Sequence, residues 1–278
     1  MKKTILGFVA LFFYSSLTLA QGFIFAEQHK GKSSYIVENG RLKSKLVFPF
    51  KFQAVGVGLN KTYHGIHYIF KAATLVKNIR TTGKDYDWEN NQLTVFSSSD
   101  NDVKDFVSIG LEVAKDITDY STIFANMQYR ELDLLWSDTK QQNLVNNQAL
   151  HLTGDTLGYE QKFYQLNLGI SYQQSLSNNI NLSIKPSVIF ALVESVDRHF
   201  RRNFYTIQNN VANGYGIHIM LSRKIDKDST LSLSFNQENY QDKHNQMKRY
   251  FTLAPSDSLS ASYKYNTQKV GIFYQQQF

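Results

Sequence analysis

The sequence contains no cysteine, only three prolines and no uninterrupted apolar run of the length that a membrane-spanning helix needs. The first absence means that disulfides do not stabilise the chain, which suits an envelope protein held together by a closed sheet. The last excludes a helical membrane protein. The chain also lacks the glycine-serine nucleophile motif, the phosphate-binding loop and any spacing of zinc ligands. Its net charge of +7 comes from scattered Lys and Arg, so we expect no nucleic acid as a partner.

The amino terminus has the features of an export signal. Lys2 and Lys3 form a basic start, an apolar stretch follows, and small residues stand before Gln21 at the positions that signal cleavage requires. We therefore expect residues 1–20 to be a cleaved signal peptide. Residues 21–278 would then form a single exported domain, without repeats or linkers.

The stretch from Asn179 to Phe200 gives the clearest structural pattern. Side chains on a strand alternate between two faces. The even positions from Leu182 to Val196 are mostly apolar, whereas the odd positions are polar or small over much of their length. A long strand that is apolar on one face and wet on the other is typical of a transmembrane β-barrel. The terminal Phe278 after an amphipathic segment resembles the last strand of bacterial outer-membrane proteins.

The same alternation predicts about ten strands. Their approximate ranges are 23–38, 43–59, 64–77, 103–113, 121–136, 157–174, 179–200, 214–223, 231–236 and 269–278. Asn39-Gly40 predicts a tight hairpin between the first two. Polar loops are expected at 78–102, 137–156, 201–210 and 242–256. Long connections alternate with short ones, and an even count leaves no open edge. The fold class is therefore all-β: a ten-stranded antiparallel transmembrane β-barrel with long extracellular loops, in the outer membrane of a Gram-negative bacterium.

Two pairs of titratable residues stand out at the long-loop end. Asp85 and Asp87 follow the third expected strand, and Asp197 and His199 end the seventh. In extended backbone, residues two apart point the same way. Adjacent carboxylates raise one pKa, and an aspartate orients an imidazole, so water between the pairs would be activated by general-base catalysis. Such pairs are more often solvated acids at a barrel rim, and no further ligand at metal-site spacing accompanies them.

These motifs resemble those of the omptins, a family of outer-membrane proteases. Asp85 to Trp88 matches the family's Asp-x-Asp-Trp, Val193 to His199 matches its Val-Glu-Ser and Asp-x-His elements with a shorter spacing, and Leu157 to Ser171 is similar to its sixth strand. The resemblance implies an endopeptidase in which Asp85 and Asp87 form one catalytic couple and Asp197 and His199 the other. It implies His199 as the general base and a peptide or protein as the substrate.

The resemblance also implies a lipid requirement, because omptin activity depends on lipopolysaccharide. Tyr129 and Glu131 match two of the family's lipopolysaccharide contacts, and Lys162 stands where the family has arginine. All three should face outward. Asp133 stands where the family has another arginine, so one of the family's phosphate contacts is absent. Lys162 would bind a phosphate more weakly than arginine does, because an ammonium group cannot make the two parallel hydrogen bonds of a guanidinium.

The substrate pocket departs from the family. Omptins cleave beside basic residues because acids line this pocket. Here Ser195 stands at one of those acid positions, and Ser33, Ser34 or Tyr35 at the other. A basic side chain would be left without a partner. We therefore expect specificity that is not strictly dibasic.

Two functions from different classes stay open. The first is an omptin-like endopeptidase, favoured by retention of all four candidate residues. The second is a non-proteolytic barrel of the same descent, an adhesin or a structural surface protein, favoured by loss of the acidic pocket. A solute channel suits the narrow lumen of ten strands poorly. We expect a monomer.

Overall fold

The computed structural model describes residues 21–251 and 255–277. The predicted signal peptide and Phe278 lie outside the described residues. Within them no helix is long and apolar enough to cross a membrane. The strands are β1 (Gln21–Asn39), β2 (Leu42–Tyr63), β3 (Ile66–Asn78), β4 (Thr81–Glu89), β5 (Gln92–Thr118), β6 (Ser121–Asn143), β7 (Gln148–Ser177), β8 (Ile180–His199), β9 (Phe204–Lys224), β10 (Ser229–Tyr250) and β11 (Pro255–Gln277).

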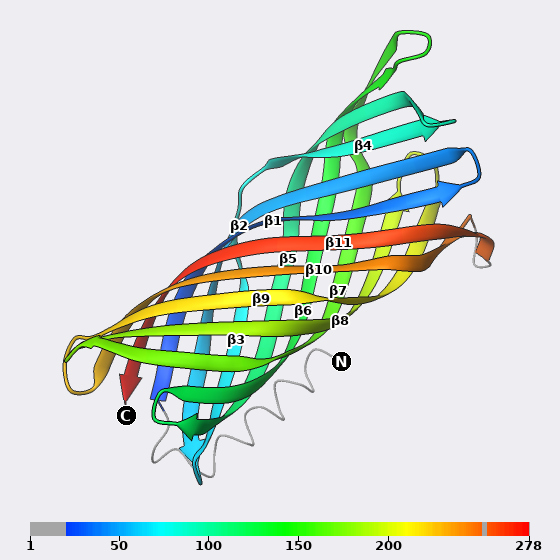
Figure 1. The fold of residues 1–278 in the computed structure, drawn as a ribbon. Coiled ribbons are helices and arrows are strands. Elements are labelled where there is room, and N and C mark those ends of the chain that lie inside the picture. Colours follow the sequence, from blue (N-terminus) through cyan, green and yellow to red (C-terminus); the bar gives the residue numbers. More distant parts are fainter. Residues whose placement is uncertain (1–20, 252–254, 278) are drawn as a thin grey trace.

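The strands close into an antiparallel ring of ten positions (Figure 1). β3 and β4 share one position, because both pair with β2 on one side and β5 on the other. Ile79 and Arg80 form the break between them, and the Ile79 amide donates a hydrogen bond to the Lys51 carbonyl across it. β1 pairs with both β2 and β11, which completes the ring. The predicted ten-stranded barrel is confirmed.

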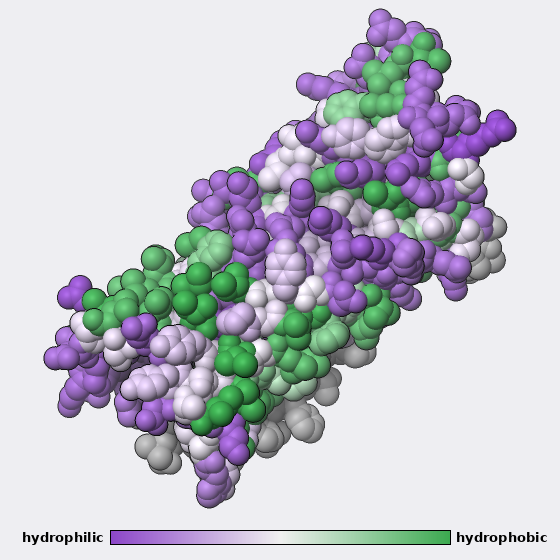
Figure 2. All heavy atoms as spheres, viewed as in Figure 1, coloured by the Kyte–Doolittle hydropathy of each residue, from purple (hydrophilic) through white to green (hydrophobic). Residues whose placement is uncertain are grey.

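The two faces of β8 follow the predicted alternation. Ile189, Ala191 and Val193 are buried inside the barrel, whereas Val188, Phe190 and Leu192 are more than half exposed on its outer surface. Figure 2 shows hydrophobic residues gathered over the lower half of the visible face and hydrophilic residues over the upper half. An outward-facing apolar band around a β-barrel is the part that hydrocarbon covers. The lower half is therefore the membrane-spanning part, and the upper half projects beyond it.

The predicted polar loops are largely strand. Residues 78–102 contain β4 and the first part of β5. The predicted loop at 137–156 is formed by the end of β6 and the start of β7, and only residues 144–147 between them lie outside a strand. These segments lie above the apolar belt, so water meets their outer faces and the sequence loses the alternation that marks a membrane strand. The hairpin turn Asn90-Asn91 has φ values of 50° and 65°, which suits a type I′ turn. The predicted tight hairpin between β1 and β2 is confirmed, but its two turn residues are Gly40 and Arg41, because Asn39 still pairs with Leu42.

Side chains fill the lumen. In the upper half, aromatic and aliphatic residues from many strands form one buried cluster, including Phe48, Phe50, Tyr159, Phe163 and Tyr263. In the lower half, charged residues replace them, and Arg130 is buried at 2% exposure. The interior is therefore a packed core with small cavities, which argues against a general solute channel.

Candidate functional site at the outer mouth

Asp85 and Asp87 lie on β4 and point into the mouth of the barrel. The alternate residues Tyr86 and Trp88 stack on the opposite face with ring centroids 5.8 Å apart. The pairing of β4 with β5 shifts register between Asp87 and Trp88, and such bulges often redirect side chains at functional sites. The sequence placed this segment in a loop. It is instead a paired strand, which holds the two carboxylates on one face more firmly than a loop would.

Asp85 is electrostatically perturbed. Burial, and next the negative charge of Asp87, raise its pKa from the ordinary aspartate value to about 7. A hydrogen bond of 3.2 Å from the Ser44 hydroxyl on β2 acts in the opposite direction. A carboxyl group with this pKa exchanges its proton near neutral pH, as a general acid or base must.

Asp197 and His199 form the second pair, at the end of β8. Asp197 is 1% exposed, and its Oδ2 lies 3.4 Å from Nε2 of His199. The Tyr35 hydroxyl on β1 donates a hydrogen bond to the same Oδ2, and Oδ1 has no partner among the described residues. The His199 ring stacks on Phe204 of β9 at 4.2 Å. A buried carboxylate therefore contacts the imidazole, and stacking limits how the ring can turn.

The two pairs occupy facing walls of the mouth. Three strands separate β4 from β8 on one side of the ring and five on the other. Charge on His199 lowers the pKa of Asp85, opposing the effects of burial and Asp87. Tyr35 interacts with both walls, because burial and the charge of Asp197, and to a smaller extent that of Asp85, raise the pKa of its phenol. The structure thus brings the predicted residues to one end, within electrostatic reach of each other.

An aromatic layer forms the floor beneath the pairs. Phe48 stacks on Tyr159 at 4.2 Å and contacts Trp136 at 4.7 Å, and Tyr35 packs against Phe48 and Tyr159. All four side chains are buried. This layer of buried rings separates the mouth from the interior below.

The expected substrate pocket lies below Asp197. Uncharged polar groups line it. Ser195 is buried, and the Gln161 amide donates to the Tyr263 hydroxyl at 2.9 Å. Ser33 also donates to that hydroxyl, at 3.5 Å. Gln161 Oε1 and both amide atoms of Gln208 have no partner among the described residues. Buried unpaired amides favour a neutral hydrogen-bonding group over a cation.

The three residues matched to lipopolysaccharide contacts form one outward patch. Glu131 and Lys162 are directly paired across β6 and β7, and Glu194 of β8 flanks Lys162 on its other side. The Tyr129 hydroxyl lies 3.4 Å from Glu131, and its ring packs against Tyr164 at 5.4 Å. Beside the patch lies an apolar hollow of about 600 Å³, lined partly by Met127, Leu166, Phe190 and Leu192. Acids flank the single lysine, so the surface suits acyl chains better than phosphates.

Sequence reasoning missed two contacts in the mouth. It assigned Tyr35 only as a possible pocket residue and gave Ser44 no role. The alternation of Ser33, Tyr35 and Val37 places Tyr35 inward. Its contact with Asp197 could not be predicted, because the two residues are 162 positions apart and meet only when the barrel closes. Among the described residues no group of three or more metal-binding side chains is clustered.

No protein-family model matches this sequence, and no curated protein matches it. The structure is similar to the outer membrane protease OmpT from Escherichia coli, with a TM-score of 0.81 and 12% identity over 95% of this chain and 98% of that one. This chain is an outer-membrane β-barrel. Less similar are the translocator domain of the autotransporter NalP from Neisseria meningitidis (TM-score 0.46, 12% identity, 100% and 95% covered) and the outer membrane protein OprG from Pseudomonas aeruginosa (0.43, 7%, 93% and 96%). At these identities the likeness concerns the fold alone.

Proposed function

We propose that this barrel is an omptin-like endopeptidase that hydrolyses peptide bonds with a water held between its two titratable pairs. The observation that carries the proposal is the perturbed carboxyl group of Asp85, which responds to Asp87 beside it and to His199 on the facing wall. A carboxyl group with a strongly shifted pKa beside other titratable side chains is a candidate for catalysis. The fold likeness to a protease agrees with this assignment.

The geometry gives each pair a role in the reaction. His199 takes a proton from the water as it attacks the peptide carbonyl carbon, and Asp197 stabilises the imidazolium that forms. Protonated Asp85 donates a hydrogen bond to the developing oxyanion, and Asp87 keeps that proton in place by raising the pKa of Asp85. The proton on His199 then passes to the leaving amine. No covalent enzyme intermediate forms.

The preferred substrate would carry an uncharged side chain beside the cleaved bond. Ser195, Gln161 and Gln208 offer hydroxyl and amide groups and no carboxylate. A lysine or arginine placed there would lose its hydration without gaining a counter-charge. We therefore expect neutral polar residues to be favoured over basic ones.

Lipopolysaccharide would act as an outer contact that supports the site. Tyr129 and the neighbouring apolar hollow would hold acyl chains, and Lys162 would contribute one phosphate contact. The flanking Glu131 and Glu194 weaken that electrostatic contribution. A Lys162→Gln variant should therefore need only slightly more lipopolysaccharide for half-maximal activity.

A non-proteolytic surface barrel is the second candidate, and one observation favours it. The Tyr35 hydroxyl occupies an oxygen of Asp197 that would otherwise be available to His199. A phenol fixed there competes with the Asp197–His199 contact, and an adhesin or structural barrel would tolerate that competition without loss.

A peptide library separates the two candidates. The protein is refolded with lipopolysaccharide and compared with its Asp85→Asn and His199→Gln variants. His151→Gln, an exposed histidine in the β6–β7 hairpin, serves as the matched control. The endopeptidase predicts cleavage by the wild type and the control that both mouth variants lose. No cleavage by any of the four, or equal cleavage by all, would leave the non-proteolytic barrel.

A further inference from the structure

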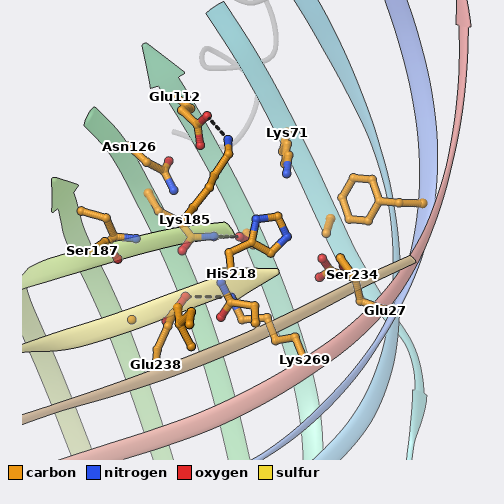
Figure 3. Close-up of a pocket in the computed structure, with 18 of the residues that line it drawn as sticks. Glu27, Lys71, Glu112, Asn126, Lys185, Ser187, His218, Ser234, Glu238 and Lys269 are labelled. Carbon is orange, nitrogen blue, oxygen red and sulfur yellow. Dashed lines mark hydrogen bonds and ion pairs between the residues drawn. The ribbon is translucent and has the colours of Figure 1, made fainter. Parts of the chain in front are cut away.

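The membrane-spanning half of the lumen contains a cavity of about 110 Å³ that is lined mostly by polar and charged side chains (Figure 3). Lys71 of β3, Lys185 of β8 and His218 of β9 extend toward it from three different strands. It lies below the aromatic layer and apart from the outer mouth. The proposed peptidase chemistry uses none of its residues.

Most charges around this cavity are paired. Lys185 Nζ lies 2.6 Å from Glu112, and Glu238 lies 3.1 Å from both Lys269 and Arg130. The Glu27 carboxylate contacts His29 at 3.0 Å. Removal of a charge from water is costly unless a counter-charge replaces the lost hydration. These contacts pair Lys185, Lys269 and Arg130 with Glu112 and Glu238, and they give the Glu27 carboxylate a hydrogen bond from His29.

Lys71 is different. Among the described residues, no carboxylate lies within ion-pair distance of its ammonium group. Its contacts are the rings of Phe23 at 5.9 Å and Phe273 at 5.2 Å. Cation–π contacts replace only part of the hydration of an ammonium group. With both histidines neutral, four cations (Lys71, Arg130, Lys185, Lys269) face three carboxylates (Glu27, Glu112, Glu238), which leaves one positive charge uncompensated.

We propose that the cavity binds one small inorganic oxyanion of the phosphate class against Lys71. Such an anion supplies the missing negative charge. His218, Asn126, Ser187 and Ser234 line the same space and offer hydrogen-bond donors from several directions, as a tetrahedral oxyanion requires. At roughly 10–15 Å³ per water position, the cavity holds several waters, so the anion fits with part of its hydration shell.

The structure also indicates how the anion enters. A second cavity of about 130 Å³ shares Glu112, Phe124 and Lys185 with the first and reaches His67 and Asp116 at the lower end of the barrel. His67 and Asp116 are partly exposed there. On the opposite side, His29 stacks on Phe52 at 4.5 Å and contacts Phe106 at 5.0 Å, which closes the lumen. Anions would therefore enter from the periplasmic side and remain bound without crossing.

Equilibrium dialysis of the refolded full-length barrel against radiolabelled inorganic phosphate tests the proposal directly. We expect saturable binding of one phosphate per barrel at constant ionic strength. Sulfate should compete, whereas chloride and acetate should compete weakly because they offer fewer acceptor oxygens. Absence of saturable binding to the wild type, or displacement by chloride as effective as by sulfate, would overturn the oxyanion assignment.

Two variants locate the site. Lys71→Met should lose phosphate binding at least tenfold, whereas Lys264→Met, an exposed lysine on β11, should bind like the wild type. Should Lys71→Met fail to fold, Asn126→Asp decides: this near-isosteric change adds a carboxylate to the cavity wall, so phosphate binding should fall by a similar factor in a folded barrel. Undiminished binding in a folded Lys71→Met or in Asn126→Asp would place the phosphate elsewhere and contradict the proposal.

Discussion

The outer mouth and the membrane-spanning interior both contain buried charges, but they arrange them in opposite ways. In the interior, Glu238 lies between Arg130 and Lys269, so opposite charges are in contact. In the mouth, Asp85 shares its wall with a second carboxylate and its pKa rises to about 7. Breaking a buried ion pair destabilises a fold, whereas crowding like charges raises the pKa of one of them. The comparison teaches that the interior neutralises most of its charges by contact, whereas the mouth keeps a carboxyl group that exchanges its proton near neutral pH.

The largest effect should come from removing the proposed general base. His199→Gln should lower kcat/KM by about 10²- to 10⁴-fold, because a positioned base contributes about that much. Thermal stability should change little, since His199 lies at the rim. Peptide hydrolysis and the unfolding midpoint are measured on the same preparation. A variant that loses stability and activity in proportion would show that His199 acts structurally.

Glu238→Gln should have the opposite effect, a loss of stability with little change in activity. Arg130 and Lys269 would lose their shared carboxylate, and breaking a buried pair destabilises by about 3–5 kcal/mol. Denaturant unfolding in detergent measures the free energy of unfolding. Activity per folded molecule should stay at the wild-type level. A loss of activity in the folded fraction would mean that the two regions are not independent.

Tyr35→Phe should have an intermediate effect. The phenol donates a hydrogen bond to Asp197, and hydrogen bonds to charged groups contribute about 1.5–3 kcal/mol. We expect activity to fall about tenfold because the buried carboxylate loses its only described hydroxyl donor. Peptide cleavage at saturating lipopolysaccharide provides the measurement. A rise in activity would instead identify Tyr35 as an obstruction and favour the non-proteolytic barrel.

The smallest effect is a shift in pH dependence. If Asp85 must be protonated, activity falls as pH rises through its pKa of about 7. Asp87→Asn removes a neighbouring negative charge, so the pKa of Asp85 should fall and the alkaline limb should move to lower pH. A pH–rate profile of each protein measures the limb. An unmoved limb would assign it to another group.

The sequence predicts the barrel more completely than it predicts the mouth. Alternation in β8 identifies a membrane strand because lipid and lumen demand opposite residues at successive positions. Above the membrane that demand disappears, so residues 81–89 look like a loop although they form β4. The two pairs stand out in the sequence by their spacing together with their resemblance to a family motif. Their partners Tyr35 and Ser44 do not, because both contacts depend on how strands distant in sequence meet in the closed ring.

Carbon-13 NMR titration of the Asp85 carboxyl, compared between the wild type and His199→Gln, tests most directly whether the two walls form one site. The charge of His199 lowers the pKa of Asp85, so its removal should raise that pKa without any substrate present. A titration of Asp85 that is identical in the two proteins would mean that the walls do not sense each other, and would contradict a shared water between them.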